Sequence, residues 1–213
     1  LSEATKLRGN GMSNLHNDNI IIDGLIISNW SRSVFEAMRD GGLTAVNCTC
    51  CIWEDFRGAM GNVAQWKQWF LEHDDILLQV FTTDDIRRAK AEGKVGIILG
   101  WQNTSGIEDQ IGFLKVFKDL GVGVMQLTYN TQNLSGSGCW ETHDGGLSGF
   151  GREAIDEMCR ILASGINVVN TSIVSLVYPP AASPRMIARL TEACNDGGSS
   201  FFTSGFDPGW SGD

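Results

Sequence analysis

The feature that most constrains the fold of this chain is a regular alternation of short apolar segments with longer amphipathic ones. Residues 20–27 form an almost continuous apolar run, typical of a buried parallel strand. Residues 31–40 then carry apolar side chains at helical spacing and end at Gly41-Gly42. The same pair of segments recurs to the end of the chain. The expected strands are 20–27, 43–52, 76–81, 95–100, 122–128, 166–170 and 200–203; the expected helices are 31–40, 62–73, 82–93, 107–120, 152–163 and 184–195.

Strict strand–helix alternation predicts a parallel sheet joined by right-handed crossovers. The fold class is therefore α/β, built from repeated β/α units. Seven strands fit an incomplete TIM-type (β/α)8 barrel, and they also fit a doubly wound sheet, because periodicity alone does not distinguish the two. The helix at 152–163 is expected to be continuous, with the strand at 166–170 parallel to the one at 122–128.

Composition excludes several classes of function. The chain of 213 residues has 16 Lys and Arg against 25 Asp and Glu, a net charge of −9, and no basic cluster, which argues against a nucleic-acid partner. No apolar run approaches the roughly 18 residues of a membrane span, so no membrane partner is expected. Cys48 and Cys51 are three residues apart, but no histidine lies near them in the sequence, so the six cysteines are expected to be reduced thiols of a cytoplasmic protein.

Polar residues follow the ends of the expected strands. In a barrel of this order they face one rim, where ligands bind, although capping and loop hydrogen bonds are an alternative explanation. The residues assigned to substrate binding are Gln102, Asn103, Tyr129, Asn130 and Asn133. Residues 131–151 form a loop long enough to suggest a function. Tryptophans at 30, 53, 101 and 140 either line a pocket or pack under loops.

Several stretches resemble the membrane dipeptidase family (renal dipeptidase, peptidase M19). These are Ile22-Asp23-Gly24, KVGIILGWQN (94–103), LKVFKDLGVGVMQLTYNTQN (114–133) and GLSGFGREAIDEM (146–158). They follow the order of the family over about residues 18–160. The resemblance implies a TIM-type barrel, hydrolysis of a dipeptide or small amide, and two zinc ions at the carboxyl ends of the strands.

The positions that the resemblance assigns to the metal site hold other residues. Leu25 and Ile27 replace the His-x-Asp zinc ligands, the bridging Glu falls near Trp101-Gln102, and Tyr129 replaces a motif histidine. No metal ligand or cofactor is therefore assigned to this chain. Two other groups have ligand-like composition: 16–18, which precedes the first strand, and Glu141-Thr142-His143-Asp144 in the long loop. We expect a solvated turn and an exposed polar loop there.

The last part of the chain resembles a second family. ILASGINVVNTS (161–172), LVYPPAASPRMIARLTEACNDGG (176–198) and SGFDPGWSGD (204–213) are similar to dihydrodipicolinate-reductase-like, NAD(P)-dependent amine dehydrogenases, but no strand–GxGxxG–helix fingerprint accompanies them. The expected domains are an N-terminal extension (1–17), a dipeptidase-like half barrel (18–160) and a dehydrogenase-like β/α segment (161–213).

Three functions remain open at this stage. The first is a dipeptidase-like hydrolase, catalytically impaired by its missing ligands. The second is a non-catalytic barrel fragment that binds a small peptide-like ligand or a partner, and the third is an NAD(P)-dependent oxidoreductase fragment. An unclosed barrel leaves unpaired strand edges, so self-association is expected.

Overall fold

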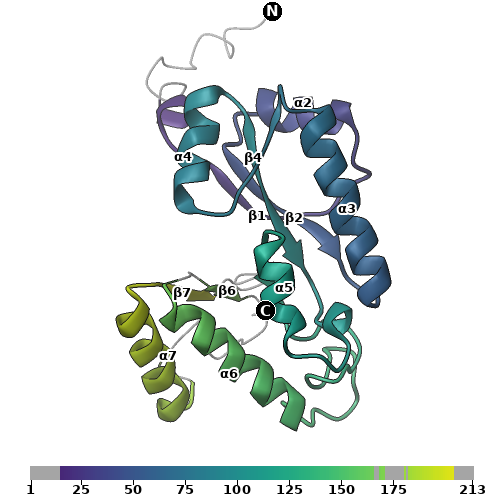
Figure 1. Cartoon of the computed structure of the whole chain (residues 1–213), viewed down its shortest axis with the longest axis vertical. Helices are drawn as coiled ribbons and strands as arrows, with labels where there is room; N and C mark the ends of the chain where they lie inside the picture. The colour runs from purple at the N-terminus through teal and green to yellow at the C-terminus, as the bar shows by residue number, and fades with distance from the viewer. Residues whose placement is uncertain (1–14, 166–167, 171–179, 181, 204–213) are drawn as a thin grey trace, which may run out of the picture. The chain divides into compact units, whose positions relative to one another are not determined.

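The computed structural model describes residues 15–165, 168–170, 180 and 182–203, and Figure 1 traces their helices and strands. Residues 1–14 of the expected extension and 204–213 of the second resemblance lie outside this part. The strands are β1 (Ile22–Ile26), β2 (Ala45–Cys51), β3 (Leu77–Gln79), β4 (Val95–Trp101), β5 (Val122–Met125), β6 (Val168–Asn170) and β7 (Phe201–Thr203). The helices are α2 (Arg32–Asp40), α3 (Phe56–Glu72), α4 (Thr83–Glu92), α5 (Phe113–Asp119), α6 (Gly149–Ala163) and α7 (Pro184–Gly197).

The strands of the described residues form one sheet in the order β1-β2-β4-β5-β6-β7. β3 pairs with the first three residues of β4, and β5 pairs with its last three. The registers of β1, β3, β5 and β7 on their neighbours are all parallel. Parallel strands alternating with helices, without closure into a barrel, confirm the expected α/β class and the incomplete TIM-type barrel.

The chain divides into two compact units, and the first comprises residues 1–48 and 65–98. Its core is aromatic: Trp66 is almost fully buried, with ring centroids 5.1 Å from Trp30 and 6.1 Å from Phe35. His73, just after the end of α3, is half-buried: its ring contacts Phe35 and its Nδ1 is buried. Asp85 closes a capping box with Thr82 at the start of α4, which explains where this helix begins.

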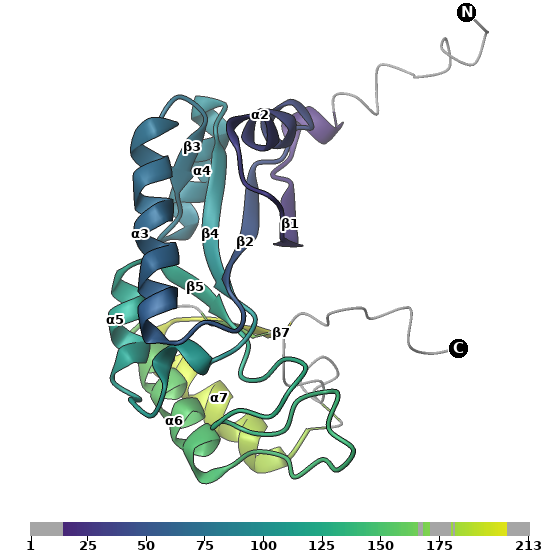
Figure 2. The ribbon, with the colours of Figure 1, turned by 90° about the vertical axis from the view of Figure 1, so that its right-hand side faces the viewer.

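The second unit comprises residues 49–64 and 99–213. Trp101 at the end of β4 packs against Phe117 of α5 at 4.3 Å, and Phe56 at the start of α3 packs against Phe113 at 4.5 Å. The helices α6 and α7 lie side by side in this unit (Figure 2). Leu162 and Leu190 join these two helices in one buried cluster.

Two helix boundaries differ from those expected. The helix expected at 62–73 begins at Phe56, because Asp55 caps it: the Asp55 carboxylate accepts from the Gly58 amide at 2.8 Å. Two glycines in residues 56–61 concealed this start from the periodicity. The helix expected at 107–120 spans only Phe113–Asp119. Glu108, which follows a 3₁₀ turn, has a φ of 49°, and this non-helical backbone conformation prevents the helix from starting earlier.

The first strand is less buried than its sequence suggested. Ile22 is 50% exposed and Ile27 is 63% exposed. β1 stands at the end of the strand order, and its register on β2 shifts between Asp23 and Ile26. The continuous apolar run suggested a buried interior strand, but β1 lies at the edge of the sheet. An edge strand has a neighbour on one side only, so it is less buried than an interior strand.

The junction between the two resemblances is continuous. α6 runs unbroken from Gly149 to Ala163, with Met158, Ile161 and Leu162 buried on one stripe. β6 is parallel to β5, with Val169 opposite Val124. The expected continuity of this helix and the docking of the strand after it are confirmed for the described residues 168–170.

Candidate functional site

Buried polar side chains of the second unit gather where β2, β4 and β5 end. Thr49, Gln102, Asn103, Thr104 and Ser135 are each at most 6% exposed. Buried polar groups are costly unless they are hydrogen-bonded, so such a cluster in a parallel α/β sheet marks a place to search for a ligand site.

Gln102 connects the end of β4 to the end of β2. Its backbone amide donates to Cys51 O at 2.9 Å, and its side-chain Nε2 donates to Thr49 Oγ1 at 2.8 Å. Its Oε1 is buried and has no hydrogen-bond partner among the described residues. The amide orientation is thereby fixed, with one acceptor left unsatisfied.

Asn103 and Asn133 form the centre of a second network. Asn133 Nδ2 donates to Asn103 Oδ1 at 2.5 Å and to Leu127 O at 2.7 Å, while Asn133 Oδ1 accepts from the Ser135 amide at 2.7 Å. Thr104 Oγ1 lies 2.8 Å from Leu127 O and from Ser135 Oγ. These bonds fasten the loop after β5 onto the loop after β4.

Tyr129 and Asn130 lie at the start of that long loop and are half-buried. The Tyr129 ring is 5.4 Å from the ring of Trp53, which is 51% exposed. Asn130 Oδ1 accepts from Cys139 Sγ at 3.2 Å, and the Cys139 amide donates to Tyr129 O at 2.9 Å. Tyr129 and Trp53 thus present aromatic surface near the strand ends.

Glu54 is a residue at this site that the sequence analysis missed. Its Oε2 accepts from the amides of Ile52 at 2.6 Å and Trp53 at 2.9 Å, and its Oε1 accepts from Asn62 Nδ2 at 3.1 Å. Burial by itself raises the pKa of Glu54, but the hydrogen bonds, first that of Ile52, outweigh it and leave the pKa lowered. In the sequence, the one sign that Glu54 belongs to the site is its position three residues after the end of β2.

The neighbouring thiols are not activated. Desolvation by burial raises the pKa of Cys50 to about 12, and burial, with a smaller effect from the charge of Glu54, also raises the pKa of Cys51. Both remain protonated at neutral pH, so neither is a nucleophile or a ready metal ligand.

All five residues assigned to substrate binding lie in the second unit, where the structure brings Asn103 and Asn133 into direct contact. Their role toward a substrate stays a prediction. The observed hydrogen bonds of Asn103 and Asn133 hold loops together, whereas Gln102 Oε1 retains its acceptor capacity. Of the four tryptophans, Trp30 and Trp101 pack in cores, while Trp53 and Trp140 are more than half exposed.

Comparison with known proteins identifies the family. The family model described as "Membrane dipeptidase (Peptidase family M19)" matches residues 30–175. The chain belongs to the membrane dipeptidase family. The match extends past residue 160, into the part that resembles the amine dehydrogenases, and the origin of residues 161–213 remains a prediction.

Solved structures agree with this assignment. An amidohydrolase from Pseudomonas aeruginosa is 40% identical, with a TM-score of 0.71, over 90% of this chain and 64% of that protein. The probable dipeptidase PvdM from the same organism is 13% identical, with a TM-score of 0.65, over 91% of this chain and 62% of that protein. A metallo peptidase from Rhodobacter sphaeroides, solved with a phosphinate mimic of L-Ala-D-Ala, is 13% identical, with a TM-score of 0.61, over 82% and 62%. The last two show the fold alone, and the chain spans less than two thirds of each protein.

The donor set of this membrane dipeptidase homologue does not fit the zinc pair. Zinc is held by thiolates, imidazoles and carboxylates. The positions that the resemblance assigns to the metal site hold Leu25, Ile27, Trp101-Gln102 and Tyr129, and none of these is such a group. The assignment of Leu25 and Ile27 stays a prediction, because the family match begins at residue 30. No three His, Cys, Asp or Glu side chains come together to hold a metal ion within residues 15–165, 168–170, 180 and 182–203.

The two ligand-like groups outside these positions have local contacts. Residues 15–18 are exposed but helical, not the expected turn, and His16 Nε2 donates to Gly41 O at 3.0 Å. In the long loop, Glu141 accepts from the Gln132 amide and Asp144 accepts from the Gly146 amide, while His143 is exposed. None of the described helices is both long enough and apolar enough to cross a membrane.

Proposed function

We propose that this chain is the part of a dipeptidase-type hydrolase that binds a small amide- or peptide-like ligand at the strand ends, and that it is catalytically impaired. The observation that carries the proposal is Gln102. This residue is 5% exposed, fixed by Thr49, and has a buried Oε1 without a partner among the described residues. An unpaired buried acceptor costs about 1–3 kcal/mol, which a donor N–H of a ligand would offset.

The proposed loss of hydrolysis rests on the absence of metal-binding side chains at the positions that the resemblance assigns to the metal site. A two-metal site requires carboxylates and imidazoles that bridge two cations and lower the pKa of a bound water. Gln102 is neutral at every pH, and Leu25 and Ile27 offer no lone pair. Glu54 alone does not substitute for them, because no three His, Cys, Asp or Glu side chains come together within the described part of the chain.

Glu54 instead positions the aromatic side of the proposed site. By accepting from the Ile52 and Trp53 amides, it fixes the turn after β2 that carries the Trp53 ring beside Tyr129. A flat aromatic surface next to a fixed carboxamide suits a ligand with a peptide group and a short side chain.

The proposal is tested by elemental analysis and calorimetry on the purified 213-residue chain. We expect less than one zinc per chain, no change of melting temperature on adding a chelator, and no hydrolysis of Ala-Ala. A metal at a hundred times its dissociation constant would add about 2.7 kcal/mol of stability, so melting is a sensitive reporter. Stoichiometric zinc together with hydrolysis of Ala-Ala would contradict the impairment.

Ligand binding is tested separately with Gln102→Ala. We expect binding of Ala-Ala to the unaltered chain and a roughly tenfold loss in the variant, about 1.4 kcal/mol. Gln110→Ala, an exposed amide of the same unit, is the matched control. Quenching of fluorescence by NADPH would instead support the oxidoreductase alternative.

A further inference from the structure

A groove of about 410 Å³ lies between α6 and α7, away from the strand-end site and within the second unit. Its floor is apolar, formed by Leu147, Ile155, Met186 and Leu190. All four are half-buried or buried. The floor therefore offers a non-polar ligand a surface that is shielded from water on one side.

The rim of this groove is cationic. Arg152, Arg185 and Arg189 line it, with Asp156 as its one acidic residue. Arg189 Nη2 pairs with Asp156 Oδ1 at 2.6 Å, whereas within the described residues the guanidinium groups of Arg152 and Arg185 make no hydrogen bond or ion pair. Two positive charges thus remain uncompensated in a chain whose net charge is −9.

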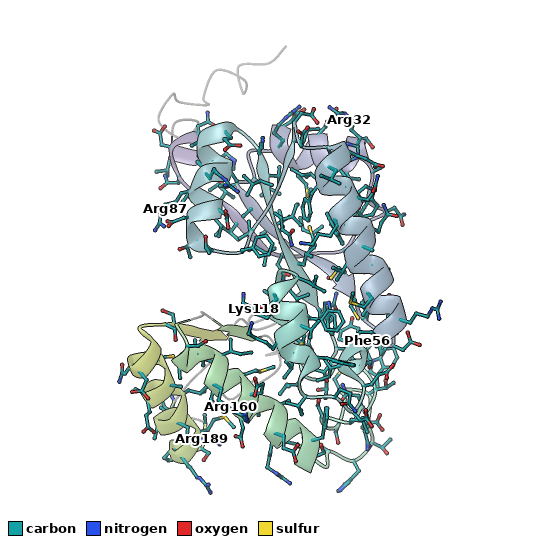
Figure 3. The ribbon with its side chains drawn as sticks, viewed as in Figure 1. Arg32, Phe56, Arg87, Lys118, Arg160 and Arg189 are labelled. Carbon is teal, nitrogen blue, oxygen red and sulfur yellow. The ribbon has the colours of Figure 1, made fainter. Side chains whose placement is uncertain are left out.

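The excess positive charge is confined to the groove between α6 and α7, as a neighbouring cavity shows. The Arg189–Asp156 pair also borders a second cavity, of about 400 Å³, whose further charged residues are Arg160, Glu192 and Asp196. That cavity has one negative charge in excess. Arg160 and Arg189 mark the two helices in Figure 3. The ion pair therefore separates an anionic hollow from the cationic groove.

We propose that the groove between α6 and α7 binds an organic anion with an apolar body, such as an aliphatic carboxylate. The guanidinium fork matches a carboxylate in a bidentate geometry, and Arg152 and Arg185 have this capacity unused among the described residues. Both arginines are exposed, so charge alone gives weak binding and contact with the apolar floor supplies the rest. Ser183, at the N-terminus of the 14-residue α7, makes no side-chain cap hydrogen bond and adds a donor beside them.

The test is a calorimetric titration of the full chain at low salt with three probes. Sodium octanoate carries both the charge and the chain, octanol carries only the chain, and inorganic phosphate carries only the charge. Octanoate is expected to bind at millimolar concentrations or better, and at least about tenfold more tightly than either other probe. No binding of octanoate, or equal binding of octanol or phosphate, would overturn the proposal.

Variants and a thiol probe locate the site. The double variant R152Q/R185Q should weaken octanoate binding about tenfold, while R39Q/R87Q, which removes the same charge from exposed helices of the first unit, should leave it unchanged. Circular dichroism confirms that each variant is folded.

Octanoate should also slow alkylation of Cys159, which lines the groove, without slowing that of the exposed Cys139, as resolved by mass spectrometry. Equal losses in both double variants, or no protection of Cys159, would place the ligand elsewhere.

Discussion

Glu54 shows how one carboxylate can stabilise the site without acting on a substrate. Its hydrogen bonds favour the ionised form, so its pKa is lowered in the folded chain despite burial. A group whose pKa is lowered on folding stabilises the fold above its unfolded pKa, and this contribution is lost as the pH falls through the folded pKa.

Glu54→Gln is therefore expected to reduce the free energy of unfolding by about 1 kcal/mol at pH 7, a value discounted for the partial exposure of the group. The difference from the unaltered chain should begin to shrink as the pH falls below the ordinary glutamate pKa of about 4.3, and it should vanish only once the pH falls below the lowered pKa of the folded chain. Urea unfolding at several pH values measures this. Glu153→Gln, at an exposed position of α6, is the control, and a pH-independent difference for Glu54→Gln would exclude the ionised carboxylate as the cause.

At the scale of the elements, the start of α6 depends on a glycine for a steric reason. The Gly151 amide donates to Ser148 Oγ at 3.0 Å in the helix cap, and a Cβ at Gly151 would overlap the carbonyl oxygen of Ser135. Ser148 Oγ in turn donates to Leu134 O. The helix is thus fastened to the long loop at its first turn.

Gly151→Ala should destabilise the chain by about 2 kcal/mol, although alanine favours helices by about 1 kcal/mol over glycine. Gly149→Ala is a matched control in the same turn, because a Cβ there meets no atom within 4 Å. Thermal unfolding compares the two. A neutral Gly151→Ala would mean that the loop at Ser135 moves away at little cost.

The buried stripe of α6 gives a second test at this scale. Ile161 is 9% exposed and Leu162 is fully buried. Ile161→Asp should cost about 3 kcal/mol or more, since it buries a carboxylate without a partner. Ala188→Asp, on the exposed face of α7, should cost less than about 0.5 kcal/mol. Similar small losses for both would show that α6 does not depend on this stripe.

For the molecule as a whole, the edge of β1, which pairs with no second strand among the described residues, predicts association between copies. β1 ends the strand order, and its Ile22 is half exposed. Such edges pair with other strands unless they are protected by charge. Light scattering at tens of micromolar should detect dimers or larger assemblies, and Ile22→Lys should shift them toward monomer. Leu71→Lys, at an exposed helical position, should not. A monomer before any substitution would contradict the edge prediction.

Within the described residues, the sequence by itself determined the type and order of the seven strands and of the six α-helices between them, but not the 3₁₀ turn at Ser105–Ile107 or the helical residues 15–18. Continuous apolar runs and the helical period of 3.6 residues are local properties of the sequence, so they can be recognised without knowing which elements are neighbours. The motifs at 94–103, 114–133 and 146–158 also indicated the family, whereas the loss of metal ligands at Leu25 and Ile27 stays a prediction. The sequence also placed Gln102 at a strand end, because the residue follows β4 directly.

Only the tertiary structure decided how these groups are used. That Gln102 donates to Thr49, 53 residues away, while its Oε1 lacks a partner among the described residues, depends on which strands are neighbours. The position of β1 at the edge, the interruption at Glu108 and the cap at Asp55 are likewise decided by contacts that periodicity does not contain. Hydrogen bonds and burial between residues distant in sequence are set by packing, so a pattern read along one chain specifies the elements but not their partners.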